Sequence, residues 1–269
     1  MTSLARIEAA GHALDLEYAW VGAANAPVVV FLHEGLGSLA MWKDYPARLC
    51  AALAARGLVY SRPGYGASTP RPRGEKWPVD FMHRQARDVL PALLEALEVD
   101  RPWLFGHSDG ASIALLHAAA FPERVAGVIA VAPHLFVEDL SVRNIEAARV
   151  AYESGDLRDR LTRYHGDPDS AFFGWNEIWL DPAFRGWNIE ADVVALRCPV
   201  LAVQGEGDEY GTMAQIDRLA DRVPQTKLLK LADCGHSPHR DQPERLTAAV
   251  AAFYGRNART PHGAAALSR

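Results

Sequence analysis

Cysteine is scarce in this chain, and no long apolar run is present. The 269 residues include three cysteines, Cys50, Cys198 and Cys234, which lie far apart in the sequence. An odd number of widely spaced cysteines argues against a disulfide framework and favours a reducing compartment. No window approaches the roughly 20 apolar residues that span a bilayer, and residues 1–6 lack the basic and apolar pattern of a secretory signal. We therefore expect a cytoplasmic protein without a membrane span.

An excess of basic residues is also lacking. The chain has 28 Lys and Arg residues against 33 Asp and Glu residues, which gives a net charge of -5 at pH 7 and an isoelectric point near 6.1. Because no block rich in Lys or Arg is present, the sequence carries no electrostatic footprint for nucleic acid. The expected partner is a small-molecule substrate, and none of these features bears on the oligomeric state.

Apolar runs that alternate with helical patterns dominate the rest of the sequence. This alternation indicates an α/β fold with a mostly parallel, doubly wound sheet covered on both faces. Strands are predicted at 28–32, 58–61, 103–105, 125–132, 200–203 and 228–231, and helices at 39–53, 81–97, 111–120, 212–223 and 243–254. Residues 7–21 instead alternate apolar and polar side chains, which predicts an N-terminal antiparallel hairpin. Pro91 is expected to kink its helix or to mark the helix start.

The alternation stops between Pro133 and Cys198, where the sequence is helical and aromatic. We predict that residues 136–190 form a helical cap inserted into a core of residues 1–135 and 191–256, with a disordered tail at 257–269. Most aromatic side chains of this segment should form the small core of the cap, while a minority, including Trp175 as a possible substrate contact, should line a pocket. These aromatics are Phe172, Phe173, Trp175, Trp179, Phe184 and Trp187.

The sequence Gly106-His107-Ser108-Asp109-Gly110 lies between an apolar strand pattern and a strong helix pattern. A serine on a tight turn from strand to helix is exposed at the end of its strand, where it is available as a nucleophile. The two flanking glycines suit such a turn because its backbone is strained and neighbouring elements approach closely. We interpret the motif as a nucleophile elbow that carries Ser108.

Three further motifs join the elbow in a resemblance to the α/β-hydrolase superfamily, which extends from about residue 7 to 256. Segment 33–38, His-Glu-Gly-Leu-Gly-Ser, resembles the family's oxyanion loop, with Glu34 where a glycine is usual. Segment 205–208, Gly-Glu-Gly-Asp, follows a strand where family members place the triad acid. Segment 234–238, Cys-Gly-His-Ser-Pro, resembles the loop that holds the triad histidine.

The resemblance implies a catalytic triad of Ser108, Asp208 and His236, in the chain order that the family uses. A serine hydroxyl is a weak nucleophile at neutral pH, so an imidazole must accept its proton and a carboxylate must orient that imidazole. The same resemblance implies that the backbone N–H groups of Gly35 and Asp109 form the oxyanion hole. No metal and no organic cofactor is expected.

Other residues compete for some of these roles. The alternative acids are Glu206, Glu209, Glu138 and Asp139, and the alternative histidines are His239, His107 and His33. The spacing of Cys234, His236 and His239 also permits a metal site, although no second cluster of ligands accompanies it. Segment 61–68 is interpreted as the turn after the second parallel strand, because it lacks the lysine of a nucleotide-binding loop.

Two carboxylates near the implied oxyanion hole bear on the substrate. A negative side chain beside a developing oxyanion is unfavourable, so Asp109 and Glu34 should point away from it or face a cationic group of the substrate. The second arrangement would favour esters that carry an amine, because members of the family that hydrolyse esters of amino acids can carry an acidic residue directly after the nucleophile, as Asp109 is here; Glu34 is then a further possible substrate contact. For Asp109, we expect instead that its side chain caps or hydrogen-bonds the N-terminus of its own helix.

Within this superfamily, the motifs favour hydrolysis of a small carboxylic ester through an acyl-serine intermediate. The alternative is hydrolysis of a carbon–carbon bond in a ring-fission product of aromatic degradation, which uses the same triad on a similar capped scaffold. A third hypothesis is a small-molecule receptor that keeps the triad without turnover.

Overall fold

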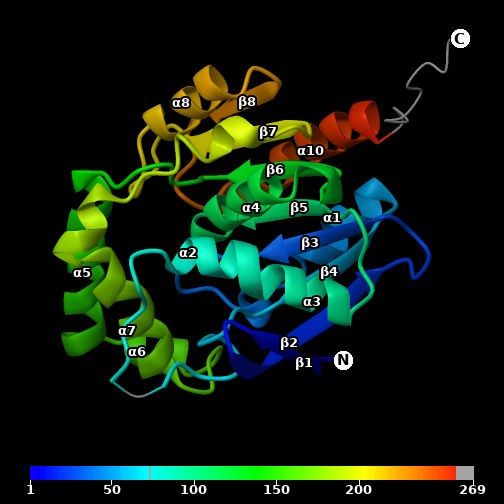
Figure 1. The fold of residues 1–269 in the computed structure, drawn as a ribbon. Helices are drawn as coiled ribbons and strands as arrows, with labels where there is room; N and C mark the ends of the chain where they lie inside the picture. Colours follow the sequence, from blue (N-terminus) through cyan, green and yellow to red (C-terminus); the bar gives the residue numbers. More distant parts are fainter. Residues whose placement is uncertain (73, 259–269) are drawn as a thin grey trace, which may run out of the picture.

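Eight strands form one sheet at the centre of the computed structural model, which describes residues 1–72 and 74–258 (Figure 1). The strands are β1 (Ser3–Ala9), β2 (His12–Gly22), β3 (Val28–Leu32), β4 (Arg56–Tyr60), β5 (Trp103–His107), β6 (Gly127–Val131), β7 (Val200–Gly205) and β8 (Thr226–Leu231). Their order in the sheet is β1-β2-β4-β3-β5-β6-β7-β8. The pairs β1–β2 and β2–β4 are antiparallel, and the other neighbours are parallel. The predicted fold class, with its N-terminal hairpin, is confirmed.

Helices cover both faces of this sheet. They are α1 (Tyr45–Leu53), α2 (Phe81–Arg84), α3 (Leu90–Ala96), α4 (Asp109–Ala120), α5 (Asp139–Ser154), α6 (Leu157–Leu161), α7 (Pro168–Trp179), α8 (Ala214–Arg222), α9 (Pro238–Asp241) and α10 (Pro243–Asn257). Short 3-10 helices occur at Leu39–Trp42, Pro122–Arg124, Pro182–Gly186 and Val193–Ala195. In the described ranges, no helix is long and apolar enough to cross a membrane.

The parallel strands are buried on both sides, and successive side chains enter two different cores. In β3, Val30 and Leu32 pack in the core beneath α2, α3, α4 and α8, whereas Val29 and Phe31 pack in the core beneath α1 and α10. This alternation follows from the two-residue period of a strand, and burial on both faces explains why these strands are continuous apolar runs.

The helix predicted at 81–97 is divided into three parts. A π-helical turn, Gln85–Val89, separates α2 from α3, and Pro91 lies in the first turn of α3. The backbone stays helical through Val89 and Leu90, so Pro91, which has no N–H to donate, directly follows the π turn within one helical segment. The regular α-helix is thus interrupted next to Pro91, as expected. At the other end of the chain, α10 continues to Asn257, and residues 259–269 of the predicted tail lie outside the described residues.

The chain between β6 and β7 contains α5, α6 and α7, which group at the end of the sheet toward which the arrows of β3 and β6 point (Figure 1). Aromatic rings fill the space between these helices. The rings of Tyr152 and Phe172 stack with centroids 3.8 Å apart, and those of Phe184 and Trp187 stack with centroids 5.3 Å apart. The carboxyl ends of parallel strands, where α/β folds bind ligands, therefore lie next to a wall of aromatic helices.

The N-terminal hairpin braces the loop that follows β4. The Glu17 carboxylate accepts hydrogen bonds from the Ser61 hydroxyl at 2.7 Å and from the Ala67 backbone N–H at 3.1 Å. The Glu17 backbone N–H in turn donates to the Ser68 hydroxyl at 2.9 Å. The carboxylate and the backbone N–H of Glu17 thus fix both ends of segment 61–68, which is the turn after a parallel strand, as predicted.

Candidate active site

Ser108 lies on a strained turn between β5 and α4. Its φ of 54° and ψ of −123° are unusual for a residue other than glycine. A Cβ atom at Gly106 would lie closer than 3.0 Å to the backbone of Gly110, and one at Gly110 would lie closer than 3.0 Å to the backbone of Leu32. The elbow therefore needs both glycines, because backbone atoms occupy the space that side chains would fill.

The structure brings Asp208 and His236 together. Asp208 Oδ1 lies 2.8 Å and Oδ2 lies 3.0 Å from His236 Nδ1. Burial alone would lower the pKa of His236, but the hydrogen bond and negative charge of Asp208 outweigh this effect and raise it. Because Nδ1 donates to the carboxylate, Nε2 is the nitrogen of His236 that is free to act as a base.

Asp208 is held by several donors at once. Its Oδ1 accepts from the backbone N–H groups of Tyr210 at 2.8 Å and Gly211 at 3.1 Å, and its Oδ2 accepts from Gln204 Nε2 at 2.8 Å. Burial would raise the pKa of Asp208, but the hydrogen bond and charge of His236 and the bond from Tyr210 outweigh it and lower the pKa. Asp208 is therefore an ionised carboxylate.

The alternative acids lie elsewhere. Glu209 accepts from the backbone N–H of His236 at 3.1 Å, and Glu138 accepts from Thr212 and Gln215, so neither carboxylate is bonded to the ring of His236. Asp139 pairs with Arg185 at 3.1 Å, and Glu206 is exposed.

A cavity of about 110 Å³ joins the predicted site residues. It is lined by Glu34, Gly35, Leu36, Ser108, Asp109, His134, Ile145, Trp175, Trp179, Tyr210 and His236. Six of the site residues predicted from the sequence line this cavity: Ser108, His236, Gly35, Asp109, Glu34 and Trp175. The seventh, Asp208, does not line it and is bonded to the ring of His236. Trp175 covers the oxyanion loop so closely that a Cβ atom at Gly35 would overlap its indole ring.

The backbone N–H groups of Gly35 and Asp109 are both free to bind a ligand. Asp109 is the first residue of α4, where a helical N–H has no intrahelical acceptor, and its position at a helix N-terminus favours negative charge. Gly35 lies in the loop after β3, and within residues 1–72 and 74–258 neither amide donates a hydrogen bond to another residue. Two adjacent free donors in a small cavity are suited to an oxyanion.

The carboxylates of Asp109 and Glu34 both face groups of the protein, although Asp109 Oδ2 is buried and has no hydrogen bond among the described residues. Asp109 Oδ1 accepts from Trp179 Nε1 at 3.2 Å, and Oδ2 lies 3.8 Å from Arg62 Nη2. The Glu34 carboxylate lies 3.4 Å from His107 Nδ1 and 3.4 Å from Arg240 Nη2. The expectation that Asp109 caps its own helix is wrong, because its side chain turns to the tryptophan of α7 and to the buried arginine of segment 61–68.

These contacts affect the two carboxyl groups differently. Burial raises the pKa of Asp109, and the charge of Arg62 with the hydrogen bond from Trp179 offsets this rise only in part. Burial acts in the same direction on Glu34, but the hydrogen bond and charge of His107 and the charge of Arg240 outweigh it and hold the pKa well below its usual range.

His134 is a member of the site that the sequence analysis missed. It follows β6, its Nε2 lies 3.4 Å from Ser108 Oγ, and its buried Nδ1 has no hydrogen-bond partner among the described residues. Burial, followed by the positive charge of His236, lowers its pKa to about 3, so the ring is neutral. Its backbone is fixed by Ser112, whose hydroxyl donates to the His134 carbonyl at 2.7 Å and accepts from the His134 N–H at 3.0 Å. A polar residue three positions after the end of a parallel strand was the available signal, since residues that follow such strands share one edge of the sheet.

The other candidate histidines serve as supports. His107 Nε2 donates to the backbone carbonyl of His236 at 2.7 Å, and His33 Nε2 accepts from the backbone N–H of Arg62 at 3.0 Å. His239 packs against the rings of Trp42 and His107. Among residues 1–72 and 74–258, no three His, Cys, Asp or Glu side chains are grouped so that they could hold a metal ion.

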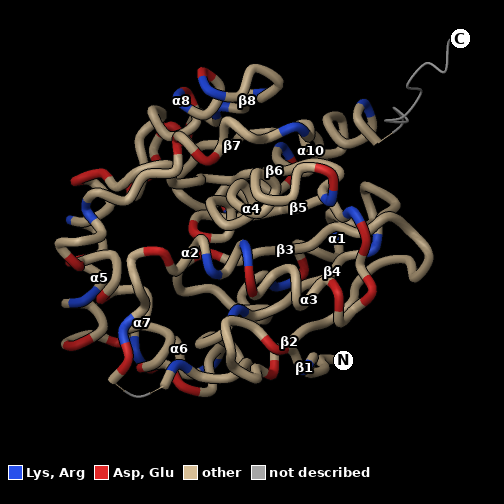
Figure 2. The backbone as a smooth tube through the Cα atoms, viewed as in Figure 1, with Lys and Arg blue, Asp and Glu red and all other residues tan. Residues whose placement is uncertain are grey.

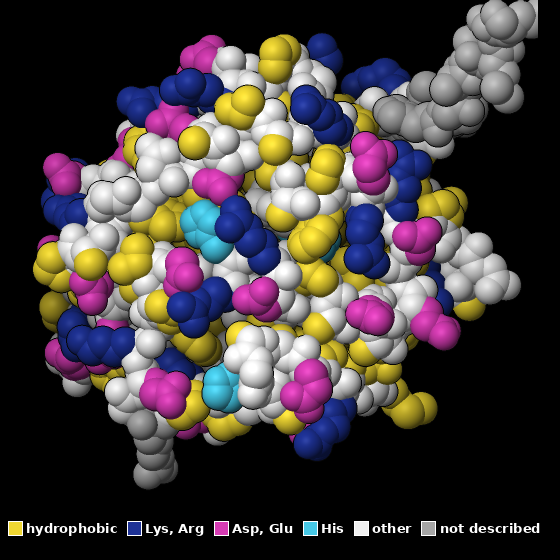
Figure 3. All heavy atoms as spheres, in the orientation of Figure 1, with side chains coloured by type: hydrophobic (Ala, Val, Ile, Leu, Met, Phe, Trp, Pro, Cys, Tyr) yellow, Lys and Arg dark blue, Asp and Glu magenta, His cyan; other side chains and the backbone are white. Residues whose placement is uncertain are grey.

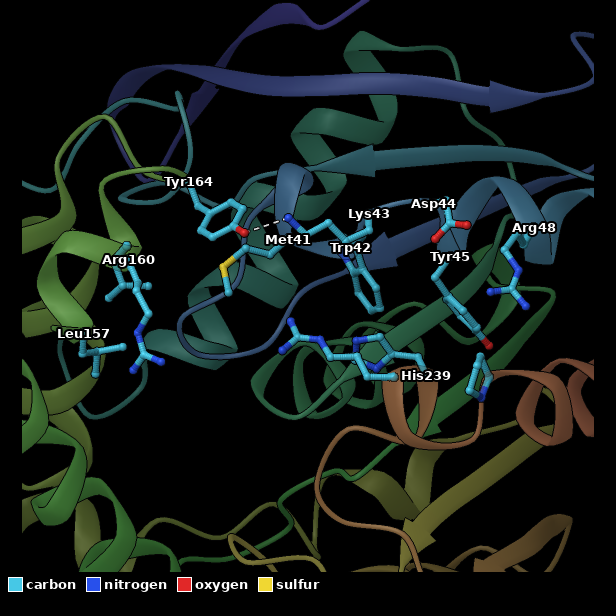
Figure 4. Close-up of a pocket in the computed structure, with 13 residues that line it drawn as sticks. Met41, Trp42, Lys43, Asp44, Tyr45, Arg48, Leu157, Arg160, Tyr164 and His239 are labelled. Atoms are coloured by element: carbon cyan, nitrogen blue, oxygen red, sulfur yellow. Dashed lines mark hydrogen bonds between the residues drawn. The ribbon is translucent and has the colours of Figure 1, made fainter.

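A larger cavity of about 640 Å³ lies between α6 and the segment around α1, and Figure 4 shows its lining. Each of its four basic side chains has a partner. Lys43 Nζ donates to the Tyr164 hydroxyl at 2.7 Å, Arg48 pairs with Glu244, Arg160 pairs with Asp156, and Arg240 pairs with Glu34. Acidic and basic residues are also interspersed along the backbone in Figure 2 and over the face in Figure 3. Ser108 and His236 line the smaller cavity, not this one.

Comparison with known proteins is consistent with this arrangement of residues. A model of the alpha/beta hydrolase family matches residues 29–250. The chain belongs to the alpha/beta hydrolase family. This family membership accounts for the order of the sheet and for the position of Ser108 between β5 and α4.

Individual relatives include two enzymes and a solved structure. The chain is 38% identical over 258 residues to the pimeloyl-(acyl-carrier protein) methyl ester esterase of Aromatoleum aromaticum, which covers 82% of this chain and 95% of that protein. It is 27% identical over 183 residues, 65% of its length, to the human serine hydrolase BPHL, and it spans 61% of the length of that protein. A structure of a carboxylesterase of Nitrososphaera gargenis matches with a TM-score of 0.75 at 18% identity and covers 94% of this chain and 98% of that one. The structural likeness shows the shared fold.

Proposed function

We propose that this alpha/beta hydrolase is a serine esterase that cleaves small, uncharged carboxylic esters through an acyl-serine intermediate. The observation that carries the proposal is the meeting, in one cavity of about 110 Å³, of a serine on a strained elbow and an imidazole paired with a buried carboxylate. A carboxylate paired in this way sets the tautomer of the imidazole and stabilises its protonated form.

The proposed reaction has two halves. Ser108 Oγ forms a bond to the ester carbonyl carbon while its proton passes to His236 Nε2, and the carbonyl π electrons move onto the oxygen. The N–H groups of Gly35 and Asp109 bind that oxyanion. The alkoxide then leaves with the proton of His236, and water repeats the sequence to release the acid and to restore Ser108. In the resting structure Ser108 Oγ lies 3.4 Å from His134, so rotation of the hydroxyl toward His236 precedes attack.

The lining of the cavity supports a small and neutral substrate. Apart from the proposed catalytic groups, Glu34 and the neutral His134, the walls come from aromatic and aliphatic side chains, including Ile145, Trp175 and Trp179. The negative charges of Asp109 and Glu34 already face Arg62 and Arg240, so they offer little to an amine of the substrate. We infer from the same lining that residues 136–190 act as a cap, since Trp175 and Trp179 enter the cavity from this segment.

A fluorophosphonate probe and a panel of nitrophenyl esters test the proposal. Wild-type protein should be labelled by the probe and should hydrolyse short acyl esters, and Ser108→Ala should lose both activities. Ser154→Ala, which changes an exposed serine at the end of α5, is the matched control and should keep both. Turnover of a ring-fission dienoate without turnover of esters would favour the carbon–carbon hydrolase. Absence of both labelling and turnover in the wild type would favour a receptor.

A further inference from the structure

Arg62 is buried beneath the active site, although arginine is rarely buried. Its side chain is 1% exposed, and among the Lys and Arg residues of 1–72 and 74–258 it is the only one that is buried. It follows β4 and its guanidinium lies over the ring of Tyr65, 4.6 Å from the ring centroid. A buried cation is costly unless neighbouring groups compensate it, so its partners indicate why it is there.

The partners of Arg62 belong to the two residues that supply the oxyanion donors. Arg62 Nη2 donates to the backbone carbonyl of Glu34 at 2.8 Å, and the same nitrogen lies 3.8 Å from Asp109 Oδ2. The Glu34 carbonyl belongs to the peptide unit whose N–H is that of Gly35. Arg62 therefore binds the carbonyl end of the peptide whose opposite end faces the catalytic cavity.

His33 binds the same carbonyl and is itself oriented by Arg62. His33 Nε2 accepts from the Arg62 N–H at 3.0 Å, so its Nδ1 carries the proton and donates to the Glu34 carbonyl at 2.7 Å. The Gly37 backbone N–H also donates to this carbonyl, at 3.0 Å. Three hydrogen bonds, one of them from a cation, thus fix the plane of the Glu34–Gly35 peptide. Donors on a carbonyl oxygen polarise the peptide and make its N–H a stronger donor.

We propose that Arg62 is a positioning residue for the oxyanion hole, which orients and polarises the Glu34–Gly35 peptide so that the Gly35 N–H meets the developing oxyanion. The proposal rests on the esterase function proposed above. Arg62 does not line the cavity and acts through the peptide, while the Asp109 carboxylate lies 3.8 Å from the guanidinium without a hydrogen bond to it and partly balances its charge. The simpler explanation, in which Arg62 only neutralises Asp109, predicts a different outcome when both charges are removed.

The test compares Arg62→Met/Asp109→Asn with Asp109→Asn alone. The double variant removes both buried charges, which proteins tolerate better than the loss of one partner, and both variants keep the backbone N–H of residue 109. The measurements are kcat and KM for a neutral nitrophenyl ester, and the inhibition constant of a trifluoromethyl ketone. Ser108 adds to this ketone and places a negative oxygen in the oxyanion hole.

We expect kcat of the double variant to be about 10- to 100-fold below that of Asp109→Asn, with KM changed by less than about threefold. The inhibition constant should rise by a similar factor. Arg62→Lys/Asp109→Asn should recover part of the loss, because lysine can donate to the Glu34 carbonyl. Equal kcat and inhibition constants in the double variant and Asp109→Asn would overturn the proposal, as would a rise in KM alone. An inactive wild type would instead contradict the esterase function.

Discussion

Asp208 and Asp109 are two buried aspartates at the cavity that holds Ser108. Burial raises the pKa of both carboxyl groups, but their hydrogen-bond partners lower the pKa to different extents. Asp208 accepts hydrogen bonds from two backbone N–H groups, Gln204 and His236, and its pKa is lowered. Asp109 accepts one hydrogen bond, from Trp179, with Arg62 at 3.8 Å, and its pKa is raised. The donors that reach Asp208 outweigh the effect of burial, whereas those that reach Asp109 do not.

The comparison separates two uses of a carboxylate in one site. In the proposed reaction, the firmly held charge of Asp208 stabilises the imidazolium that forms on His236. Asp109 lies beside the proposed oxyanion hole, where a full negative charge would oppose the developing oxyanion. A weakly stabilised charge that faces away to a buried cation suits the second position.

The largest difference should appear when each aspartate is replaced by asparagine. Asp208→Asn should lower kcat by about 10⁴-fold, because an amide cannot hold the imidazole in the correct tautomer. Asp109→Asn keeps its backbone N–H and should lower kcat by less than about tenfold, or ~1.4 kcal/mol. Ester turnover by purified variants, with circular dichroism as the check on folding, measures both. Equal losses of kcat would contradict the division of roles.

The pH dependence of kcat/KM tests the Asp208 side of the comparison. His236 must be neutral to accept the serine proton, so kcat/KM should rise with pH through the pKa of His236. Because Asp208 raises that pKa above the ordinary value of 6.5, the midpoint in the wild type should lie above pH 6.5. In the residual activity of Asp208→Asn the midpoint should move to lower pH, since burial then dominates. An unchanged midpoint would show that Asp208 does not set the basicity of His236.

The smallest expected effect concerns the single hydrogen bond of Asp109. Trp179→Phe keeps a ring in the cap segment and removes the N–H that Asp109 accepts from, so it should lower the free energy of unfolding by about 1–3 kcal/mol. Trp187→Phe is the matched control, because the buried indole nitrogen of Trp187 has no hydrogen-bond partner in the described structure. Urea denaturation compares the two variants. A loss as large in the control would assign the effect to packing rather than to the carboxylate.

The sequence contained local signals for much of the fold and for several site residues. Glycines around Ser108, the position of Asp208 after a buried strand and the alternation of residues 7–21 each reflect chemistry within a few residues of the feature they predict. The segments that carry His236 and Gly35 were instead identified by their resemblance to the α/β-hydrolase superfamily.

Contacts between distant segments were not predictable in this way. The side chain of Asp109 was assigned to its own helix, whereas its partners are Arg62 and Trp179, 47 and 70 residues away by their numbers. His134 was missed because its importance comes from the packing of β6 beside β5, which brings it to Ser108. Local patterns indicate where a chain turns, but the partner of a buried polar group depends on tertiary packing.

The Glu17 carboxylate connects the N-terminal hairpin to the loop that carries Arg62. The family match starts at residue 29, after the hairpin, yet Glu17 anchors the Ser61 hydroxyl that directly precedes Arg62. A chain shortened to the matched region would keep every residue with a proposed chemical role. It would lose the hydrogen bonds by which Glu17 holds segment 61–68. Position 17 is therefore far from Ser108 in the sequence but is connected to the proposed oxyanion loop through Ser61 and Arg62. We expect a substitution at Glu17 to affect the position of that loop.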